Sequence, residues 1–310
     1  MRTRRSQSSS DPVSRVEGHR SVLLHEAIEA LSIQENDIVV DGTLGGAGHA
    51  KEIAQHLGPG GTLIGFDLDR DAIERAHVAL EKSACAVHLI ESNFRNLDTE
   101  LHARGVEAVD KALFDLGWSS FQLDAGRGFS FQKDEPLRMT YSKEENGLTA
   151  EIVVNTWAEE SLADVIYGFG EERFARRIAQ HIVEARAKKR IETSSQLAEI
   201  IKAAVPAAYR FGRIHPATKT FQALRIAVND ELGAIDQGIR SAWRMLRANG
   251  RIAVITFHSI EDRAVKHLFR ALSLENGQLL TKKPQRPSAE EISENPRARS
   301  AKLRVLQKLS

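Results

Sequence analysis

The sequence predicts an α/β fold in which a mostly parallel sheet carries an inserted all-helical domain. Between residues 22 and 115, short apolar runs alternate with helical patterns, as in successive strand–helix–strand units. No strand-like run then occurs from about residue 126 to 216. A β-branched apolar run at residues 251–257 resumes the strands, so the helical stretch interrupts one sheet.

Composition excludes several classes of protein. The chain has 310 residues, of which 42% are hydrophobic, enough to bury one large core or two modest ones. Its net charge of +1 gives no whole-molecule attraction to nucleic acid, so a polyanion site would need local clustering of charge. The single cysteine, Cys85, excludes an internal disulfide and a cysteine-rich zinc site. Because the histidines are scattered, we expect no metal.

The N-terminal residues and the hydropathy pattern give an expectation for the cellular location of the protein. No apolar run reaches membrane-spanning length. Residues 1–17 are rich in Arg and Ser, and the pair Arg4-Arg5 lacks the apolar segment that follows it in an export signal. We therefore expect a disordered tail at residues 1–17 on a cytoplasmic protein without membrane contact.

The predicted elements before the insertion are a lead-in helix and four strands. Apolar residues at helical spacing predict the helix over residues 22–31. Apolar runs predict strands at residues 37–41, 62–67, 87–90 and 112–115, each followed by polar residues. In parallel sheets ligands bind beyond the carboxyl ends of the strands, so these polar residues are candidates for a site.

A glycine-rich loop follows the first predicted strand and leads into a helical pattern. It reads Asp41-Gly42-Thr43-Leu44-Gly45-Gly46-Ala47-Gly48-His49. The dinucleotide fingerprint Gly-x-Gly-x-x-Gly fails here, because Lys51 occupies the place of its third glycine. An Asp-Gly-x-x-Gly-x-x-Gly run resembles instead the S-adenosylmethionine loop of Rossmann-like methyltransferases. A plain turn between strand and helix remains the alternative.

Single residues at the ends of the next strands are the other candidates. An acid at the end of a second strand accepts hydrogen bonds from ribose hydroxyls in nucleotide-binding folds, which favours Asp67, whereas Asp69 and Asp71 fit a helix cap. Phe94 could flank an adenine ring or be an ordinary loop aromatic under the core. Asp115, at the end of strand four, is placed to accept a hydrogen bond from an amine nucleophile, or to cap a helix or loop.

The segment from 126 to 216 predicts helices. Apolar stripes recur around residues 163–167, 174–182 and 197–204, and Thr193 or Ser194 can cap the third stripe. We assign residues 18–125 and 217–310 to the sheet domain and 126–216 to an inserted helical domain for substrate recognition. Seven basic residues between 173 and 190 form either a solvated face or a phosphate contact.

After the insertion, the pattern predicts one long helix and the rest of the sheet. The helix runs from residue 217 to 246 and stops at Asn249-Gly250. The strand at 251–257 is followed by His258-Ser259, and two further strands lie near 279–281 and 303–306. Residues 284–300 are polar and rich in Pro, Arg and Ser, which predicts a long loop.

Together these stretches resemble the bacterial 16S rRNA cytosine-N4 methyltransferases of the MraW/RsmH type, from about residue 19 to 308. The shared motifs are the glycine loop, residues 115–124, residues 127–131, HPATKTFQALRIAVNDEL at 215–232, FHSIEDRAVK at 257–266 and NPRARSAKLR at 295–304. The resemblance implies a Rossmann-like class I sheet that is dependent on S-adenosylmethionine. It implies methylation of the exocyclic N4 amine of one cytidine, cytidine 1402, in 16S rRNA of the small ribosomal subunit.

The resemblance also implies roles for single residues. Those expected to bind the cofactor are Gly45, Ala47, Gly48, His49, Asp67, Phe94, Asp115 and Gln122. Asp115 is in addition the expected catalytic residue. Those expected to face the RNA are Ser119, His258, Ser259, Asn295, Arg297 and Arg299. The oligomeric state, including a homodimer, stays open.

Three positions depart from the family pattern, and two other functions stay open. Ala47 stands where the family usually has glycine, and Glu135 and Arg138 replace a glycine and an aspartate. Methylation of DNA cytosine is the second enzyme reading, although residues 115–118 lack the proline-rich motif usual for it. A non-catalytic adenosylmethionine-binding assembly factor of the ribosome is the third.

Overall fold

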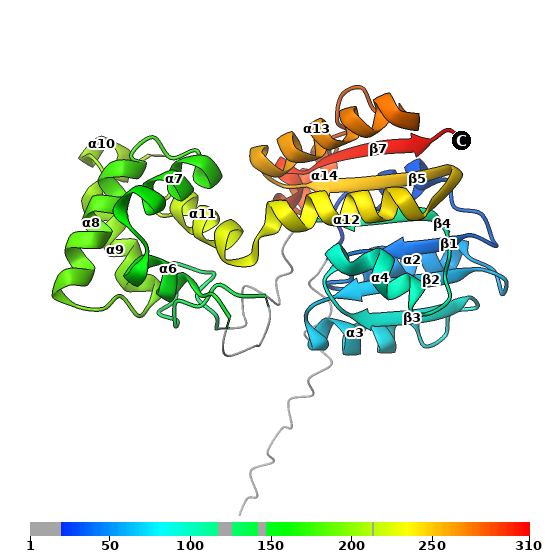
Figure 1. Cartoon of the computed structure of the whole chain (residues 1–310), viewed down its shortest axis with the longest axis horizontal. Coiled ribbons are helices and arrows are strands. Elements are labelled where there is room, and N and C mark those ends of the chain that lie inside the picture. Colours follow the sequence, from blue (N-terminus) through cyan, green and yellow to red (C-terminus); the bar gives the residue numbers. More distant parts are fainter. Residues whose placement is uncertain (1–19, 117–125, 142–146, 213) are drawn as a thin grey trace, which may run out of the picture.

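The computed structural model describes residues 20–116, 126–141, 147–212 and 214–310 (Figure 1). The predicted tail at 1–17 therefore lies outside the described residues. No helix within these ranges is long and apolar enough to cross a membrane.

The described strands form one sheet in the order β3-β2-β1-β4-β5-β7-β6. β1 to β5 run parallel to one another, while β7 is antiparallel to both β5 and β6. The prediction of a mostly parallel, Rossmann-like sheet is confirmed, and the antiparallel strands β6 and β7 complete it at one edge. The strands are β1 (Ile38–Asp41), β2 (Thr62–Asp67), β3 (Ala86–Glu91), β4 (Val109–Asp115), β5 (Leu246–Thr256), β6 (Gly277–Leu279) and β7 (Lys302–Lys308).

Helices cover both faces of the sheet. Successive strand residues point to opposite faces, so Val39 packs in the core under one layer and Val40 in the core under the other. The first layer consists of α1 (Leu24–Leu31), α2 (Gly48–His56) and α3 (Arg70–Leu80). The second consists of α4 (Leu97–His102), α12 (Glu231–Met245) and α13 (Ser259–Asn276). Because both faces are buried, the strands read as continuous apolar runs.

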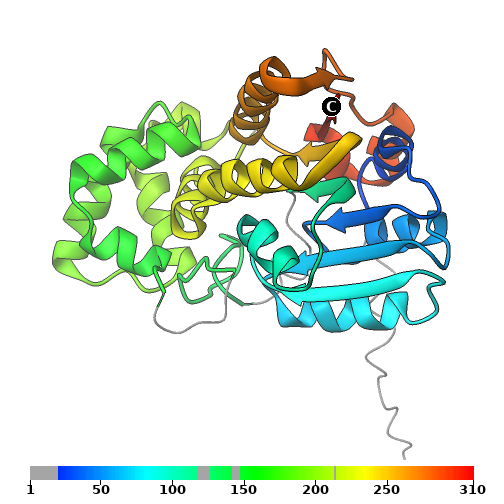
Figure 2. The same ribbon diagram turned by 45° about the vertical axis from the view of Figure 1, so that its right-hand side comes forward.

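The insertion forms a separate helical lobe with its own core (Figures 1 and 2). Thr193 caps α9 through a capping box with Gln196, which confirms one of the two predicted caps. The core of the lobe includes Phe221 and Leu224, beyond the boundary expected at 216, and the domain boundaries stay predictions. The helices of the lobe are α6 (Ala150–Thr156), α7 (Glu159–Gly170), α8 (Ala175–Lys188), α9 (Ser194–Ala204), α10 (Ala207–Arg210) and α11 (Thr218–Asn229).

Three local expectations were wrong. The long helix expected over 217–246 breaks at Asp230, which has φ 46° and ψ 48° and receives two hydrogen bonds from Arg95. β5 begins at Leu246 rather than 251, because Asn249 adopts φ 65° and lets the chain bulge and rejoin β4. The expected loop at 284–300 contains α14 (Ala289–Glu294), capped by Ser288, and a 3₁₀ helix (Pro296–Ser300).

Candidate active site

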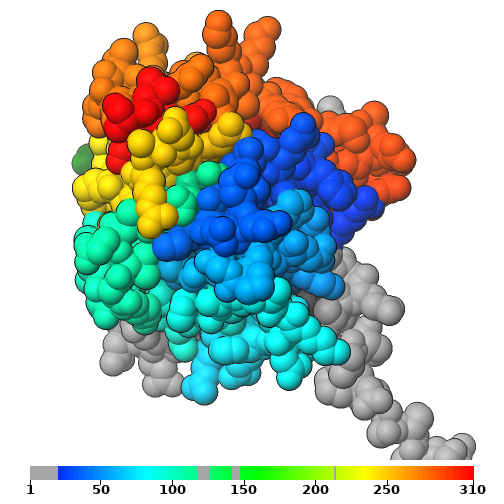
Figure 3. Space-filling model, turned by 90° about the vertical axis from the view of Figure 1, so that its right-hand side faces the viewer, coloured from blue at the N-terminus to red at the C-terminus, as the bar shows by residue number. Residues whose placement is uncertain are grey.

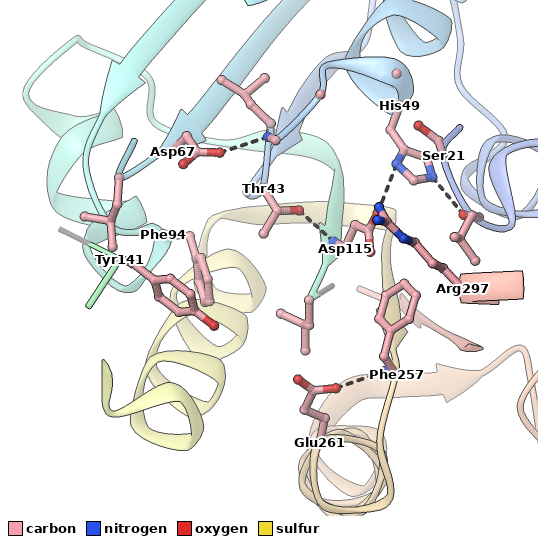
Figure 4. A pocket seen from close by; sticks show the side chains of 18 of the residues that line it. Ser21, Thr43, His49, Asp67, Phe94, Asp115, Tyr141, Phe257, Glu261 and Arg297 are labelled. Carbon is pink, nitrogen blue, oxygen red and sulfur yellow. Dashed lines mark hydrogen bonds and ion pairs between the residues drawn. The ribbon is translucent and has the colours of Figure 1, made fainter. Parts of the chain in front are cut away.

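The sheet has a switch point between β1 and β4, where the connections leave in opposite directions. In open α/β sheets the crevice at the carboxyl ends of such strands is the usual ligand site. A cavity of about 560 Å³ lies there, a volume that suits a nucleotide-sized ligand (Figure 4). It is lined by the loop after β1, by Asp67, Phe94, Asp115, Tyr141 and Phe257, and by residues 294–297.

The loop after β1 lines the cavity largely with backbone. Gly45 has φ 49°, and its N–H donates to Asp67 Oδ2 at 2.8 Å, which joins the tips of β1 and β2. Ala47 also adopts a left-handed conformation, φ 60°, which glycine adopts without strain. α2 begins at the next residue, and no side chain caps it. Its first N–H groups therefore offer partners to an anionic group.

Gly48 allows close packing of the loop on the segment before α1. A Cβ there would lie 2.1 Å from the hydroxyl oxygen of Ser21, which also lines the cavity. The lead-in segment before α1 thus packs directly on the loop. A side chain at residue 48 would force the side chain of Ser21 to move.

Asp67 ends β2 and takes part in two loop contacts. Oδ2 accepts from Gly45, and Oδ1 accepts from the N–H of Asp69 at 2.9 Å. Burial raises the pKa of its carboxyl group. Asp69 instead caps α3 by accepting from the N–H of Asp71, as predicted. The carboxylate of Asp67 is thus fixed at the cavity wall, and its contact with a ribose stays a prediction.

Phe94 combines the two alternatives that its sequence context left open. Its ring packs edge-on against Phe114 with centroids 5.4 Å apart. A Cβ on Gly238 of α12 would lie 2.3 Å from the same ring. Phe94 also lines the cavity, opposite His49 and Arg297 in Figure 4. It is therefore a core aromatic with one part facing the site, and its contact with an adenine stays a prediction.

Asp115 is held at the cavity by the glycine loop. Its backbone N–H donates to Thr43 Oγ1 at 2.7 Å, and its Oδ2 lies 3.5 Å from Nδ1 of His49. The other ring nitrogen of His49, Nε2, lies 3.1 Å from the carbonyl oxygen of Val22. Since a carbonyl only accepts, Nε2 carries the proton of the neutral ring. Burial lowers the pKa of His49, so the ring is neutral near pH 7.

Asp41 is a buried acid of this site that the sequence reasoning did not single out. It is 1% exposed, its Oδ1 accepts from the N–H of Thr43 at 3.0 Å, and its Oδ2 has no hydrogen-bond partner in the described part of the chain. Burial, and then the nearby carboxylates of Asp115 and Asp67, raise its pKa to about 6, against the pull of His49 and Thr43. Ionisation of the Asp41 carboxyl group therefore destabilises the folded protein.

Replacing Asp41 by asparagine should stabilise the protein increasingly as the pH rises. The folded-state pKa of about 6 lies above the unfolded value of 3.8, so the fold binds this proton more tightly and loses stability as the pH rises through that window. The asparagine amide keeps an acceptor for Thr43 without the charge. The gain in unfolding free energy should grow by up to about 3 kcal/mol between pH 4 and pH 8.

Urea unfolding at several pH values measures this effect. Asp236→Asn on the solvent side of α12 removes the same charge from an exposed position and serves as the control. A gain for Asp41→Asn that stayed constant with pH would contradict the assigned titration.

The N-terminal end of the described chain meets residues 291–295 beside the cavity. The N–H of Leu23 donates to Glu291 at 2.7 Å, Nδ2 of Asn295 donates to the carbonyl of Arg20 at 3.2 Å, and Arg20 pairs with Glu294. Figure 3 shows the N-terminal segment beside the segment that contains α14. The side-chain amide of Asn295 thus already donates a hydrogen bond to another part of the protein. Of the other predicted RNA-facing residues here, Arg297 and Arg299 are exposed, and Arg297 lines the cavity.

His258 and Ser259 begin α13, where both side chains have protein partners. Nδ1 of His258 accepts from the N–H of Glu261, and the Glu261 carboxylate accepts from the N–H of His258, which completes a capping box. Nε2 of His258 lies 2.9 Å from Glu261. The hydroxyl of Ser259 donates to Glu171, the residue that follows α7, at 2.8 Å. An RNA-facing role for either residue stays a prediction, as it does for Ser119, which like Gln122 lies outside the described residues.

A buried ion network between the lobe and the sheet domain was missed. Arg225, 1% exposed, donates to both carboxylate oxygens of Glu231 at 2.6 and 2.8 Å. The hydroxyl of Tyr141 donates to Glu231 at 2.8 Å, and the side chain of Asn229 bonds the backbone of Met139 and Tyr141. Tyr141, Asn229 and Glu231 all line the cavity. The only sequence signal was the place of Arg225, Asn229 and Glu231 in the motif at 215–232.

One group of side chains in the described residues has ligand atoms close enough for a metal ion. The atoms of Glu231, His258 and Glu261 lie within 4.8 Å of one another. Arg225 already lies among them, bonded to Glu231 and with Nη2 3.4 Å from Nε2 of His258. Its guanidinium supplies the positive charge that the two carboxylates need. The expectation of no metal stays a prediction.

One departure from the family pattern, Glu135, has a structural explanation. Glu135, which stands at a family glycine, is buried and accepts from the N–H of Gly128 at 2.9 Å. Its own N–H donates to the hydroxyl of Ser194 at the start of α9. Glu135 thus ties the loop after β4 to the helical lobe.

The basic residues between 173 and 190, in and around α8, divide into two sets. Arg186 donates to the carbonyl of Val154, Arg190 pairs with Glu151, and Arg173 lies over the rings of Phe174 and Tyr209. The remaining ones are exposed: Arg176, Arg177, Lys188 and Lys189. This exposed set suits either a solvated face or a phosphate contact.

Comparison with known proteins finds a matching family and several similar sequences. A sequence model of the MraW methylase family matches residues 17–309. The chain is 46% identical over 308 residues to ribosomal RNA small subunit methyltransferase H of Clostridioides difficile, covering 94% of this chain and 99% of that protein. It is equally similar to the proteins of that name from Symbiobacterium thermophilum (94% and 96% covered) and Lactiplantibacillus plantarum (94% and 97% covered).

Proposed function

Because the chain belongs to the MraW methylase family, we propose that it methylates the RNA of the small ribosomal subunit, with S-adenosylmethionine as methyl donor. The acceptor we propose is the exocyclic N4 amine of a cytidine in 16S rRNA. The activity that the relatives are named for supports the RNA and the reaction. The observation that carries the proposal is the joint position of Asp67 and Asp115 at one cavity, on the tips of β2 and β4.

The residues at the cavity fit the donor. Asp67 presents a fixed carboxylate suited to ribose hydroxyls, and Phe94 presents an aromatic wall suited to an adenine. The uncapped start of α2 suits the carboxylate of the amino acid part. The loop between β1 and α2 can approach a ligand closely because its glycines carry no side chains.

Methyl transfer to an amine needs positioning more than acid–base power. The bound donor supplies an electrophilic methyl carbon. The cytidine amine is a poor nucleophile because its lone pair is delocalised into the ring. Asp115 accepts a hydrogen bond from this amine and stabilises the positive charge that develops on nitrogen. Holding both reactants in line can lower the barrier by several kcal/mol, up to roughly 7–11 in favourable models.

The target base must leave its stack to reach Asp115, so the RNA must be held on both sides of the cavity. We assign this role to the exposed basic residues of α8 in the helical lobe and to Arg297 and Arg299 beside the cavity. On this assignment the lobe is the substrate-recognition domain, and Ser119, His258, Ser259 and Asn295 contribute further RNA contacts.

The test is transfer of label from adenosylmethionine to small subunits purified from a strain that lacks the enzyme. We expect one methyl group per particle, and mass mapping should place it on N4 of a single cytidine in 16S rRNA. Binding of the donor without transfer would favour the assembly-factor reading, and label in DNA would favour the other enzyme. Either result would reject the proposal.

Replacing Asp67 by asparagine should weaken binding of the donor by about 10- to 100-fold, since a hydrogen bond to a charged group contributes roughly 1.5–3 kcal/mol. Calorimetry with S-adenosylmethionine measures the effect. Asp71→Asn, in the first turn of α3 and not at the cavity, is the matched control and should bind within twofold of the unchanged protein. Equal affinity of both variants would contradict the ribose contact.

A further inference from the structure

The arrangement around His49 contains a contact that donor binding does not explain. Nε2 is fixed as the proton-bearing nitrogen by the carbonyl of Val22, so Nδ1 of the neutral ring has a lone pair. That lone pair faces Oδ2 of Asp115 at 3.5 Å. Two acceptors facing one another in a buried site repel, and a single shared proton turns the repulsion into a hydrogen bond.

Burial lowers the pKa of His49, but acids around the ring partly oppose that effect when a proton arrives. The ring is 5% exposed. The acids that face it come from three elements: Asp41 at the end of β1, Asp115 at the end of β4 and Glu291 in α14. Arg20 and Arg297, which also line the cavity, are the cations on the same side. Two of the acids, Asp41 and Glu291, favour the protonated ring.

From this geometry we infer that His49 and Asp115 form a proton-sharing pair, in which Asp115 takes the proton released by the target amine and passes it to Nδ1 of His49. The inference rests on the proposed methyl transfer. His49 is then a positioning residue that keeps Asp115 ionised opposite the amine.

Atoms and electrons balance in this step. The lone pair of the amine forms the new N–C bond, and the pair of the breaking C–S bond stays on sulfur, which becomes a neutral thioether. The methylated nitrogen is now cationic and carries one proton in excess. Its N–H bond breaks with the electrons left on nitrogen, and the proton moves through Asp115 to Nδ1. The positive charge thus ends on the imidazolium, beside the carboxylates of Asp41 and Glu291, and the proton returns to solvent after the product leaves.

The first test measures the protonation of His49 in the absence of substrate. In protein labelled with ¹⁵N-histidine, we expect His49 to be protonated on Nε2 near pH 7 and to take up a proton on Nδ1 as the pH falls. Asp115→Asn should move that uptake to lower pH, because it removes an anion that stabilises the imidazolium. A proton on Nδ1 at neutral pH, or a titration that Asp115→Asn leaves in place, would overturn the inference.

The second test reads the reaction. His49→Gln keeps an N–H for Val22 but cannot take up a proton, so kcat should fall about 10-fold, less than for a group that touches the reacting atom. The acid limb of the pH profile of kcat should move to lower pH in this variant. The reason is that a pair with two sites binds its first proton at higher pH than Asp115 alone. His56→Gln, at the exposed end of the same helix α2, should leave both unchanged.

The outcomes distinguish failure of the proposed His49–Asp115 pair from failure of the proposed methyltransferase activity. A higher KM for the donor with an unmoved acid limb would mean that His49 only lines the donor site. That result would overturn the pair while leaving the methyltransferase proposal intact. A coupled titration by NMR with no methyl transfer by the unchanged protein would instead reject the proposed function, and the proton relay with it.

Discussion

Asp115→Asn should lower kcat for rRNA methylation by roughly 10²- to 10³-fold, the range for loss of one group aimed at transition-state charge. Asparagine keeps the shape and one acceptor oxygen, and the backbone N–H of residue 115 still reaches Thr43. It lacks the negative charge that the developing ammonium needs, and it cannot take up the released proton. Single-turnover kinetics with labelled donor and small subunits measure the chemical step apart from release of the particle.

Asp110→Asn is the matched control for this experiment, because Asp110 lies near the other end of the same strand. Its carboxylate accepts from the N–H of Ile38 at 2.8 Å and pairs with Arg247, away from the cavity. We expect transfer within a few-fold of the unchanged protein. Full turnover by Asp115→Asn, with a normal thermal midpoint, would remove the acceptor role from Asp115.

The sheet and one side of the cavity could be predicted because their signals are local. Strands buried on both faces leave continuous apolar runs, and polar residues directly after them fall at one edge of a parallel sheet. The glycine loop, Asp67 and Asp115 meet at one cavity for that reason. Thr193 was predictable as a cap because a capping box involves only four consecutive residues, here 193 to 196.

The opposite side of the cavity escaped prediction because contacts distant in sequence build it. Tyr141 reaches Glu231 across 90 residues, and Leu23 reaches Glu291 across 268. No periodicity encodes such pairs. The break at Asp230 is a similar case, since helix propensity favoured one long helix, and a tertiary contact with Arg95 accompanies the left-handed residue.

Arg225→Met should lower the free energy of unfolding by about 3–5 kcal/mol, the range for removal of one partner from a buried ion pair. Methionine fills much the same volume, so the loss is chiefly electrostatic. Glu231 and Glu261 would remain as buried carboxylates without the cation between them. Urea unfolding at pH 7 measures the change. Arg240→Met is the control, because that pair with Asp236 is half exposed and contributes about 0.3–0.5 kcal/mol.

The double variant Arg225→Met, Glu231→Gln decides whether the network stabilises the fold or shapes the site. Removing the second charge should recover a large part of the lost stability, because a buried pair replaced as a whole is often near neutral. Methylation should not recover, since Tyr141 loses the charged acceptor that holds it at the cavity wall. If activity returned together with stability, the network would be a structural joint between lobe and sheet with no part in arranging the site.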